Sequence, residues 1–133
     1  MNIETHIKHW IDSAEHDLPV ADNLFKNGHY WWCLFVGHLV IEKILKAPYV
    51  KDNEKTPPKI HDLVRMAETT NLKLSKDQKT FLFLATTFNI EARYAEDKLK
   101  FFKICTKEFT ETNYTKIKEL YQWMKSQIQL LES

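Results

Sequence analysis

Three polar side chains at helical spacing interrupt the most apolar stretch of the chain, residues 28–47. His38, Glu42 and Lys46 are four residues apart, so a helix would place them along one line. Glu42 precedes Lys46, the order that favours a helical ion pair, which is worth about 0.2–0.5 kcal/mol when exposed. Because apolar side chains cover almost all of the remaining circumference, this helix is predicted to be central, and its polar line must face solvent, a partner subunit or a ligand.

Two further sequences carry polar groups beside apolar segments. The first is His-Asp-Leu at residues 61–63, and the second is Ala-Arg-Tyr at residues 92–94. Arginine occurs only at positions 65 and 93, among 19 lysines and arginines in all. The planar guanidinium of Arg93 suits two-point binding of a carboxylate or a phosphate, and the alternative is a cation that complements the C-terminal dipole of a helix.

A carboxylate on the first predicted helix raises a similar question. Apolar residues at positions 10, 14 and 21 share one helical face, and Asp17 lies on or beside that face. Asp17 is either an edge carboxylate in water or a partly buried one paired with a cation from another helix, because an unpaired buried charge is costly.

Composition excludes several kinds of site. With only two glycines the chain cannot form a glycine-rich phosphate loop, and no serine or cysteine lies in a nucleophile motif. Cys33 and Cys105 are predicted to be free thiols without metal-ligand spacing, and His6 and His9 have no third ligand, so neither a metal nor another cofactor is expected. The net charge of +1 gives no strong attraction to nucleic acid or anionic lipid. No apolar run suits a signal peptide or a membrane span, so a cytoplasmic location is predicted.

The chain is predicted to be a single all-α domain, residues 1–133. Apolar residues recur at the helical period, and no useful length alternates as a strand would. Ser75 and Gln78 form a capping-box sequence, and Pro48 is expected to end the central helix. Residues 48–59 and 95–109 are predicted to be loops, the second with room for a turn of helix. The expected architecture is an up-and-down bundle of four long helices and one short one, at residues 3–27, 30–47, 60–69 (the short helix), 75–92 and 112–131.

These segments together resemble the HEPN domain family. Its consensus contains A-x-x-D-L-x-x-A, H-x-x-x-E-K-x-L-K-A, P-x-x-H-D-L and A-R-Y-P, and the chain carries matching residues in that order at 14–21, 38–47, 58–63 and 92–94. The resemblance spans residues 10–94. It implies a helical bundle that usually forms homodimers and is often, in prokaryotes, the partner of a small nucleotidyltransferase subunit. Members of the family are nucleotide-binding modules or metal-independent ribonucleases.

The chain departs from the family pattern at two places, and the first bears on ribonuclease activity. Ribonuclease members carry an arginine followed within four to six residues by a histidine, and the pair handles the phosphate and the proton transfers. Here His61 is the last histidine and precedes both arginines, and positions 98–100, after Arg93, hold Lys, Leu and Lys. Ala95 also replaces the proline of A-R-Y-P. The resemblance therefore implies a member without ribonuclease chemistry, for which no catalytic residue is expected.

The sequence thus predicts a non-catalytic binding module for a nucleotide or RNA phosphate, for a nucleotidyltransferase partner, or for both, in a toxin–antitoxin-like or regulatory system. The candidate ligand-binding residues are the polar groups of the motifs: His38, Glu42, Lys43, Lys46, His61, Arg93 and Tyr94. The lysines and Arg93 would supply positive charge, His38 and Tyr94 would supply hydrogen bonds or stacking, and Glu42 would orient the cations. The alternative for the same residues is an internal polar network that fixes the register of the helices.

Two other classes of function stay open at this point. The first is an enzyme, either a ribonuclease that uses lysine and histidine in place of the missing pair or the substrate-covering subunit of a nucleotidyltransferase. The second is a purely structural dimerisation domain. We also expect His38, Glu42 and Lys46 to share one helix face, with at least one of them in contact with Arg93 or Asp17.

Overall fold

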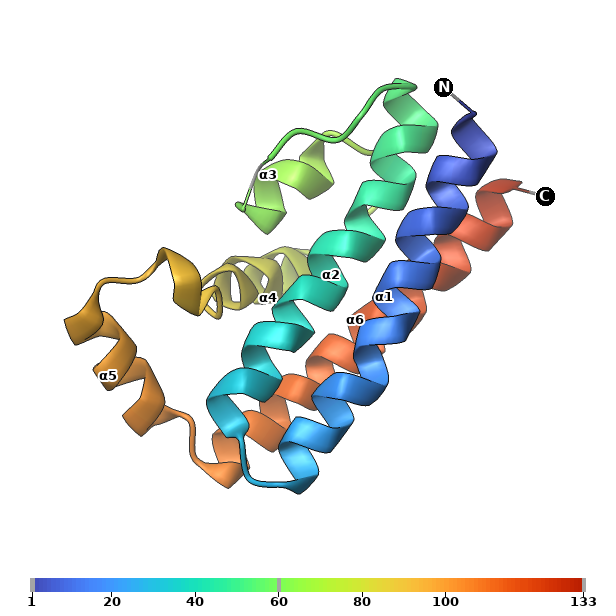
Figure 1. The fold of residues 1–133 in the computed structure, drawn as a ribbon. Coiled ribbons are helices and arrows are strands. Elements are labelled where there is room, and N and C mark those ends of the chain that lie inside the picture. The colour runs from blue at the N-terminus through green and yellow to red at the C-terminus, as the bar shows by residue number, and fades with distance from the viewer. Residues whose placement is uncertain (1, 60, 133) are drawn as a thin grey trace.

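Three long helices, α1 (Ile3–Lys26), α2 (Tyr30–Asn53) and α6 (Lys107–Glu132), run alongside one another and form the main body of the fold (Figure 1). The computed structural model describes residues 2–59 and 61–132. Helix α2 packs against both α1 and α6, and most of its side chains are buried. The predicted central helix and the all-α helical bundle are therefore confirmed.

Local sequence signals account for the ends of α1 and for the close packing of α2. The side chain of Asn2 accepts a hydrogen bond from the Thr5 amide at 3.0 Å and caps the first turn of α1. Gly28, with φ of 77°, supplies the left-handed residue that reverses the chain between α1 and α2. At Gly37, a Cβ atom would lie 2.8 Å from Ile117 Cδ1, so the missing side chain lets α6 approach α2 closely.

Polar contacts fasten α6 to α1. The Tyr114 hydroxyl donates a hydrogen bond to Asp22 at 2.5 Å, and Lys125 forms an ion pair with Glu15. Burial and the Asp22 hydrogen bond raise the pKa of Tyr114, so this phenol stays protonated.

Shorter helices complete the chain: α3 (Leu63–Glu68), α4 (Lys76–Thr86), the 3₁₀ turn η1 (Ile90–Ala92) and α5 (Ala95–Ile104). The capping box at the start of α4 is confirmed, because Ser75 and Gln78 exchange side-chain and backbone hydrogen bonds of 3.1 and 2.8 Å. In Figure 1, α4 lies behind α2, whereas the α5 backbone stands apart from the three long helices.

The prediction that Pro48 ends the central helix is wrong, because α2 continues to Asn53. Proline removes one backbone hydrogen bond and crowds the preceding turn, at a cost of about 3 kcal/mol in a helix interior. Tyr49 and Val50, which follow Pro48, are buried at 7% and 0% exposure. Burial of these two side chains offsets the proline, so the loop is shorter than expected.

The predicted loop at residues 95–109 is also wrong, since it contains α5 and the first turn of α6, which begins at Lys107 rather than 112. Phe101 faces inward and is 4% exposed, while Leu99, Phe102 and Ile104 are more than half exposed. Because the apolar residues do not share one face of the helix, the sequence pattern did not indicate a helix here. Helix α4 ends at Thr86, earlier than the expected 92. The short helix is also shorter than expected, and Ile60, its predicted start, lies outside the described residues.

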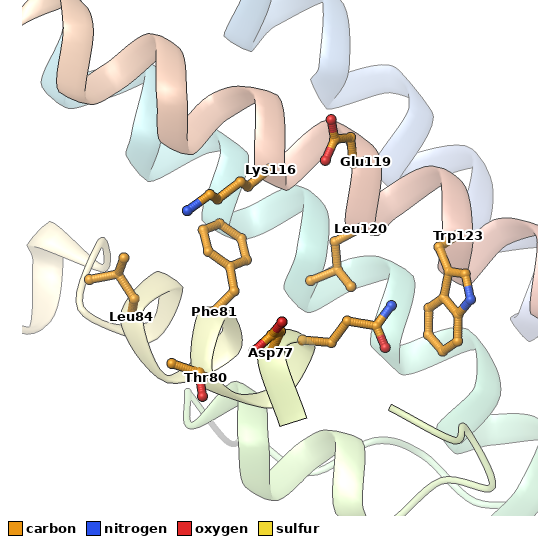
Figure 2. Close-up of a pocket in the computed structure, with 9 residues that line it drawn as sticks. Asp77, Thr80, Phe81, Leu84, Lys116, Glu119, Leu120 and Trp123 are labelled. Carbon is orange, nitrogen blue, oxygen red and sulfur yellow. The ribbon is translucent and has the colours of Figure 1, made fainter. Parts of the chain in front are cut away.

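Two surface properties bear on function. Between α4 and α6 lies a hollow of about 520 Å³, lined by residues of both helices (Figure 2). Among the residues that the structure describes, no helix is both long and apolar enough to cross a membrane.

Candidate functional site

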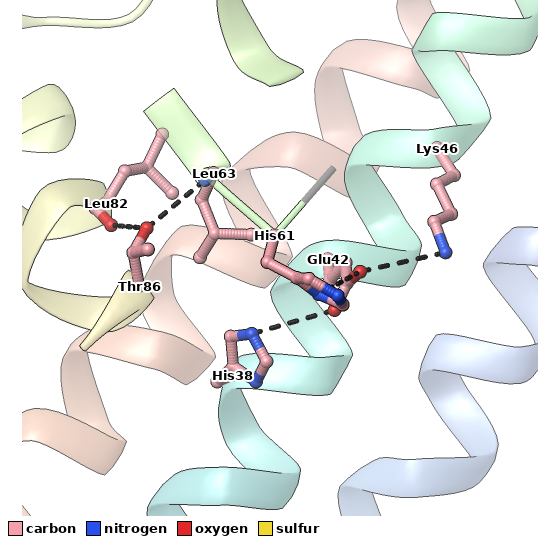
Figure 3. Close-up of polar contacts among 7 residues, drawn as sticks. All are labelled: His38, Glu42, Lys46, His61, Leu63, Leu82 and Thr86. Carbon is pink, nitrogen blue, oxygen red and sulfur yellow. Dashed lines mark hydrogen bonds and ion pairs between the residues drawn. The ribbon is translucent and has the colours of Figure 1, made fainter. Parts of the chain in front are cut away.

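Glu42 lies at the centre of the predicted polar line. Its Oε2 is 3.6 Å from His38 Nε2, and its Oε1 is 3.9 Å from Lys46 Nζ and 3.7 Å from His61 Nδ1 (Figure 3). The residue is only 7% exposed. One buried carboxylate therefore faces three basic side chains, which we call the Glu42 cluster, and the expectation that His38, Glu42 and Lys46 share one helix face is confirmed.

His38 is the most enclosed member of the Glu42 cluster. It is fully buried, and its ring stacks on Phe35 with a centroid separation of 5.9 Å. Burial lowers its pKa to about 4, so the ring is neutral at pH 7. Neither ring nitrogen forms a hydrogen bond within the described part of the chain. His38 thus contributes no positive charge near neutral pH.

His61 reaches Glu42 from a different part of the chain, because the start of α3 is tied to α4. The Leu63 amide donates to Thr86 Oγ1 at 3.2 Å, and Thr86 in turn donates to the Leu82 carbonyl at 2.9 Å. Figure 3 shows the resulting position of His61 over Glu42. The His61 side chain is 65% exposed, so it forms the solvent side of the Glu42 cluster.

The two lysines of α2 have partners on α1. Lys46 Nζ lies 4.5 Å from the centroid of the Trp10 ring, a cation–π contact that adds to its pairing with Glu42. Lys43 Nζ lies 2.7 Å from Asp17 Oδ2, and both side chains are largely shielded from water. Asp17 is therefore the paired carboxylate of the two alternatives, and the charge of each lysine is compensated within the chain.

Arg93 and Tyr94 have other surroundings. The Arg93 guanidinium donates through Nε at 2.8 Å and through Nη2 to the carbonyl of Thr87, and lies 4.6 Å from the centroid of the Phe101 ring. Thr87 is the C-terminal cap of α4, so Arg93 is the cation at a helix end that the sequence left as an alternative. Tyr94, at 84% exposure, precedes α5 and points to solvent.

Among the described residues, no hydrogen bond or ion pair joins the polar line to Arg93 or Asp17, so the expected contact is not found among these interactions. Asp17 pairs with Lys43, one residue away from the line, because position 43 faces α1. Arg93 instead donates to the Thr87 carbonyl at the end of α4. The structure brings together His38, Glu42, Lys46 and His61. Arg93 and Tyr94 form no hydrogen bond or ion pair with these four residues within the described part of the chain.

The position of Trp10 over Lys46 is not indicated by the sequence. Its ring shields Lys46, and its indole Nε1 is buried without a hydrogen-bond partner among the described residues. Its position on the buried face of α1 was visible in the sequence, but nothing there indicated which residue of α2 it meets.

Comparison with known proteins gives one match. A family model described as HEPN domain matches residues 7–127, a range that includes all seven candidate residues. No curated protein and no solved structure matches the chain.

Proposed function

Since this chain belongs to the HEPN domain family, we propose that it is a non-catalytic HEPN module that acts by binding, with protein partners as its main ligands. The partners in this proposal are a second copy of the chain and a nucleotidyltransferase subunit. The setting is a cytoplasmic toxin–antitoxin-like or regulatory system.

One observation carries the proposal: the three cations expected to hold a phosphate are engaged within the chain. Lys43 pairs with Asp17, Lys46 lies between Glu42 and Trp10, and Arg93 caps α4. A phosphate would have to break these contacts to gain the same charges. These contacts therefore fit an internal polar network that fixes the register of the helices better than they fit an anion-binding site.

Exposed apolar side chains favour protein partners. Phe83, Leu99, Phe102 and Ile104, on α4 and α5, are 72%, 65%, 59% and 53% exposed. Large exposed apolar groups that lie on neighbouring elements are typical of surfaces that associate with other proteins.

The open side of the Glu42 cluster favours a second candidate function, the binding of a nucleotide phosphate. His61 is mostly exposed there, and Trp10 Nε1 and the two nitrogens of His38 have no hydrogen-bond partner within the described residues. In this case Lys46 and His61 would contact the phosphate. The two candidates predict different results for a nucleotide titration, which in the first case gives no binding.

A cleavage assay tests the absence of catalysis. Purified protein is incubated with single-stranded RNA in EDTA over a time course, together with Arg93→Ala and the matched control Arg65→Ala. General acid–base help needs a proton carrier that titrates near neutrality, and no histidine follows either arginine. We expect no cleavage above background by any of the three proteins.

Cleavage by the wild type that disappears in Arg93→Ala but persists in Arg65→Ala would overturn the proposal and establish the ribonuclease alternative. Co-expression with a nucleotidyltransferase subunit that is encoded next to this chain's gene tests the proposed partner. A stable complex supports the proposal, and a complex that gains transferase activity assigns the chain to the substrate-covering role.

A further inference from the structure

The hollow between α4 and α6 has walls of aromatic and aliphatic side chains. Phe81 projects from α4 and Trp123 from α6, with Leu120 between them in the view of Figure 2. Among the described residues, α4 packs mainly against α3, while α6 packs against α1 and α2, so the space between α4 and α6 is left open. Its volume is about 520 Å³. Sites that bind small organic molecules have volumes of roughly 300–1,000 Å³.

Charged side chains of both signs stand at the mouth of this hollow. Asp77 lies in the first turn of α4, and Lys116 and Glu119 lie on α6. All three are exposed, and none of them forms an ion pair within the described part of the chain. In Figure 2 the Lys116 ammonium lies above the Phe81 ring and Asp77 lies below it. The hollow therefore offers a cation and a carboxylate that do not neutralise each other.

This mixture of side chains suits a small molecule better than a helix of a protein partner. Half of the positions in the two rows that line the hollow are polar or charged, at 77, 80, 116 and 119. A helix docked along these rows would place its apolar side chains against those polar groups. A small molecule can instead place its apolar part between Phe81 and Trp123 and its polar part at the mouth.

The charges at the mouth narrow the chemistry of such a molecule. A ligand that carried only positive charge would be repelled by Lys116, and one that carried only negative charge would be repelled by Asp77 and Glu119. A zwitterion avoids both penalties, because its ammonium can approach a carboxylate while its own carboxylate approaches the lysine. The rings of Phe81 and Trp123 favour a flat aromatic group in the apolar part.

We propose that the hollow between α4 and α6 binds a free amino acid with an aromatic side chain. The ligand ring lies between Phe81 and Trp123 over Leu120, the α-ammonium faces Asp77, and the α-carboxylate faces Lys116. One ligand then contacts two helices that pack little against each other, so binding holds α4 to α6. The inference goes beyond the proposed function, because the hollow shares no residue with the Glu42 cluster.

Calorimetric titration of the whole chain with L-phenylalanine and two analogues tests the recognition of both charges. Phenethylamine lacks the carboxylate, and 3-phenylpropionate lacks the ammonium. For a ligand of this size in an open site we expect L-phenylalanine to bind with a Kd of about 0.05–2 mM. It should bind about two- to fivefold more tightly than either analogue, since each analogue loses one exposed charge pair.

Two charge variants assign each end of the ligand to a side chain. Lys116→Gln should weaken the binding of L-phenylalanine about two- to fivefold without weakening that of phenethylamine. Asp77→Asn should weaken the binding of L-phenylalanine by a similar factor without weakening that of 3-phenylpropionate. Lys107→Gln and Asp97→Asn are the matched controls, because these exposed residues lie outside the hollow, and both should bind all three ligands as the wild type does.

An NMR measurement on the wild type locates the ligand even if a charge variant fails to fold. The chain has 4 tryptophans, so it gives a small set of indole N–H signals. The signal that disappears in Trp123→Phe belongs to Trp123. Addition of L-phenylalanine should shift this signal and leave unchanged those of Trp31 and Trp32, which stack on each other on α2.

Three results would overturn the inference. The first is the absence of binding by L-phenylalanine at millimolar concentrations. The second is binding that leaves the Trp123 signal unchanged, since the ligand then occupies another part of the surface. The third is equal binding of all three ligands by the wild type and both charge variants, which would mean that only an apolar hollow is recognised. In each case RNA cleavage and the nucleotidyltransferase co-expression still decide the proposed function independently.

Discussion

The Glu42 cluster and helix α5 are opposite exceptions to the usual distribution of side chains. Around Glu42, ionisable groups are buried on a helix that is otherwise apolar. On α5, large apolar groups face solvent on a helix that stands away from the long helices. A buried polar group must find partners within the chain. The apolar groups of α5 leave more than half of their surface to solvent, although the Phe102 ring also packs edge-on against Trp31 of α2 at 5.8 Å between centroids. The Glu42 cluster is therefore expected to contribute to the stability of the fold, and the exposed residues of α5 are expected to contribute little.

Histidine, glutamate and lysine at helical spacing attract attention as a functional site, but the structure surrounds them with compensating groups from α1 and from the loop before α3. The apolar residues of α5 have no such motif. The difference is expected to appear in three measurements of stability, taken from the largest effect to the smallest.

Acid should destabilise the fold through His38. Its pKa falls from 6.5 to about 4 on folding because the ring is buried, so the unfolded chain binds the proton more tightly. The stability from the neutral ring is present above about pH 6.5 and is lost as the pH falls toward 4, by roughly 3 kcal/mol over that range. Urea unfolding at a series of pH values measures it.

The matched variant for this measurement is His38→Gln, which cannot titrate. The slope of its unfolding free energy between pH 6.5 and 4 should be shallower than that of the wild type. Equal slopes would mean that the ring is not shielded as the structure indicates, and would weaken the contrast between the two regions.

Removing the charge of Glu42 should have the next largest effect. Glu42→Gln keeps the shape of the side chain but leaves Lys46 without its counter-charge in a largely buried place. We expect the free energy of unfolding to fall by about 1–2 kcal/mol, because a buried pair that loses one partner is destabilised. Glu68→Gln on the exposed surface of α3 is the control. If Glu42→Gln is at least as stable as the wild type, the desolvation of the carboxylate costs more free energy than its ion pairs contribute.

Leu99→Ser on α5 should have the smallest effect on the monomer. The side chain is 65% exposed, so its replacement should change the unfolding free energy by no more than about 0.5 kcal/mol. The comparison is made at concentrations where the wild type is monomeric. A loss as large as that of Glu42→Gln would mean that Leu99 packs within its own chain, which would remove the contrast between α5 and the Glu42 cluster.

Local sequence determined most of the long helices and part of the Glu42 cluster. The periods of residues 3–27 and 30–47, the Gly28 turn and the Ser75–Gln78 capping box are interactions within a few residues, so they can be read directly. The shared face of His38, Glu42 and Lys46 follows from helix geometry alone. The HEPN motifs added the family, which the match over residues 7–127 confirms.

Tertiary structure decided the rest, because it depends on residues far apart in the chain. Burial of Tyr49 and Val50 carries α2 past Pro48, and the Phe101–Phe88 contact holds α5 where the sequence predicted a loop. His61 reaches Glu42 because Leu63 is bonded to Thr86, and Arg93 turns to Thr87 because the end of α4 offers a free carbonyl. Spacing along a helix fixes which side chains share a face, but only packing between helices fixes what that face meets.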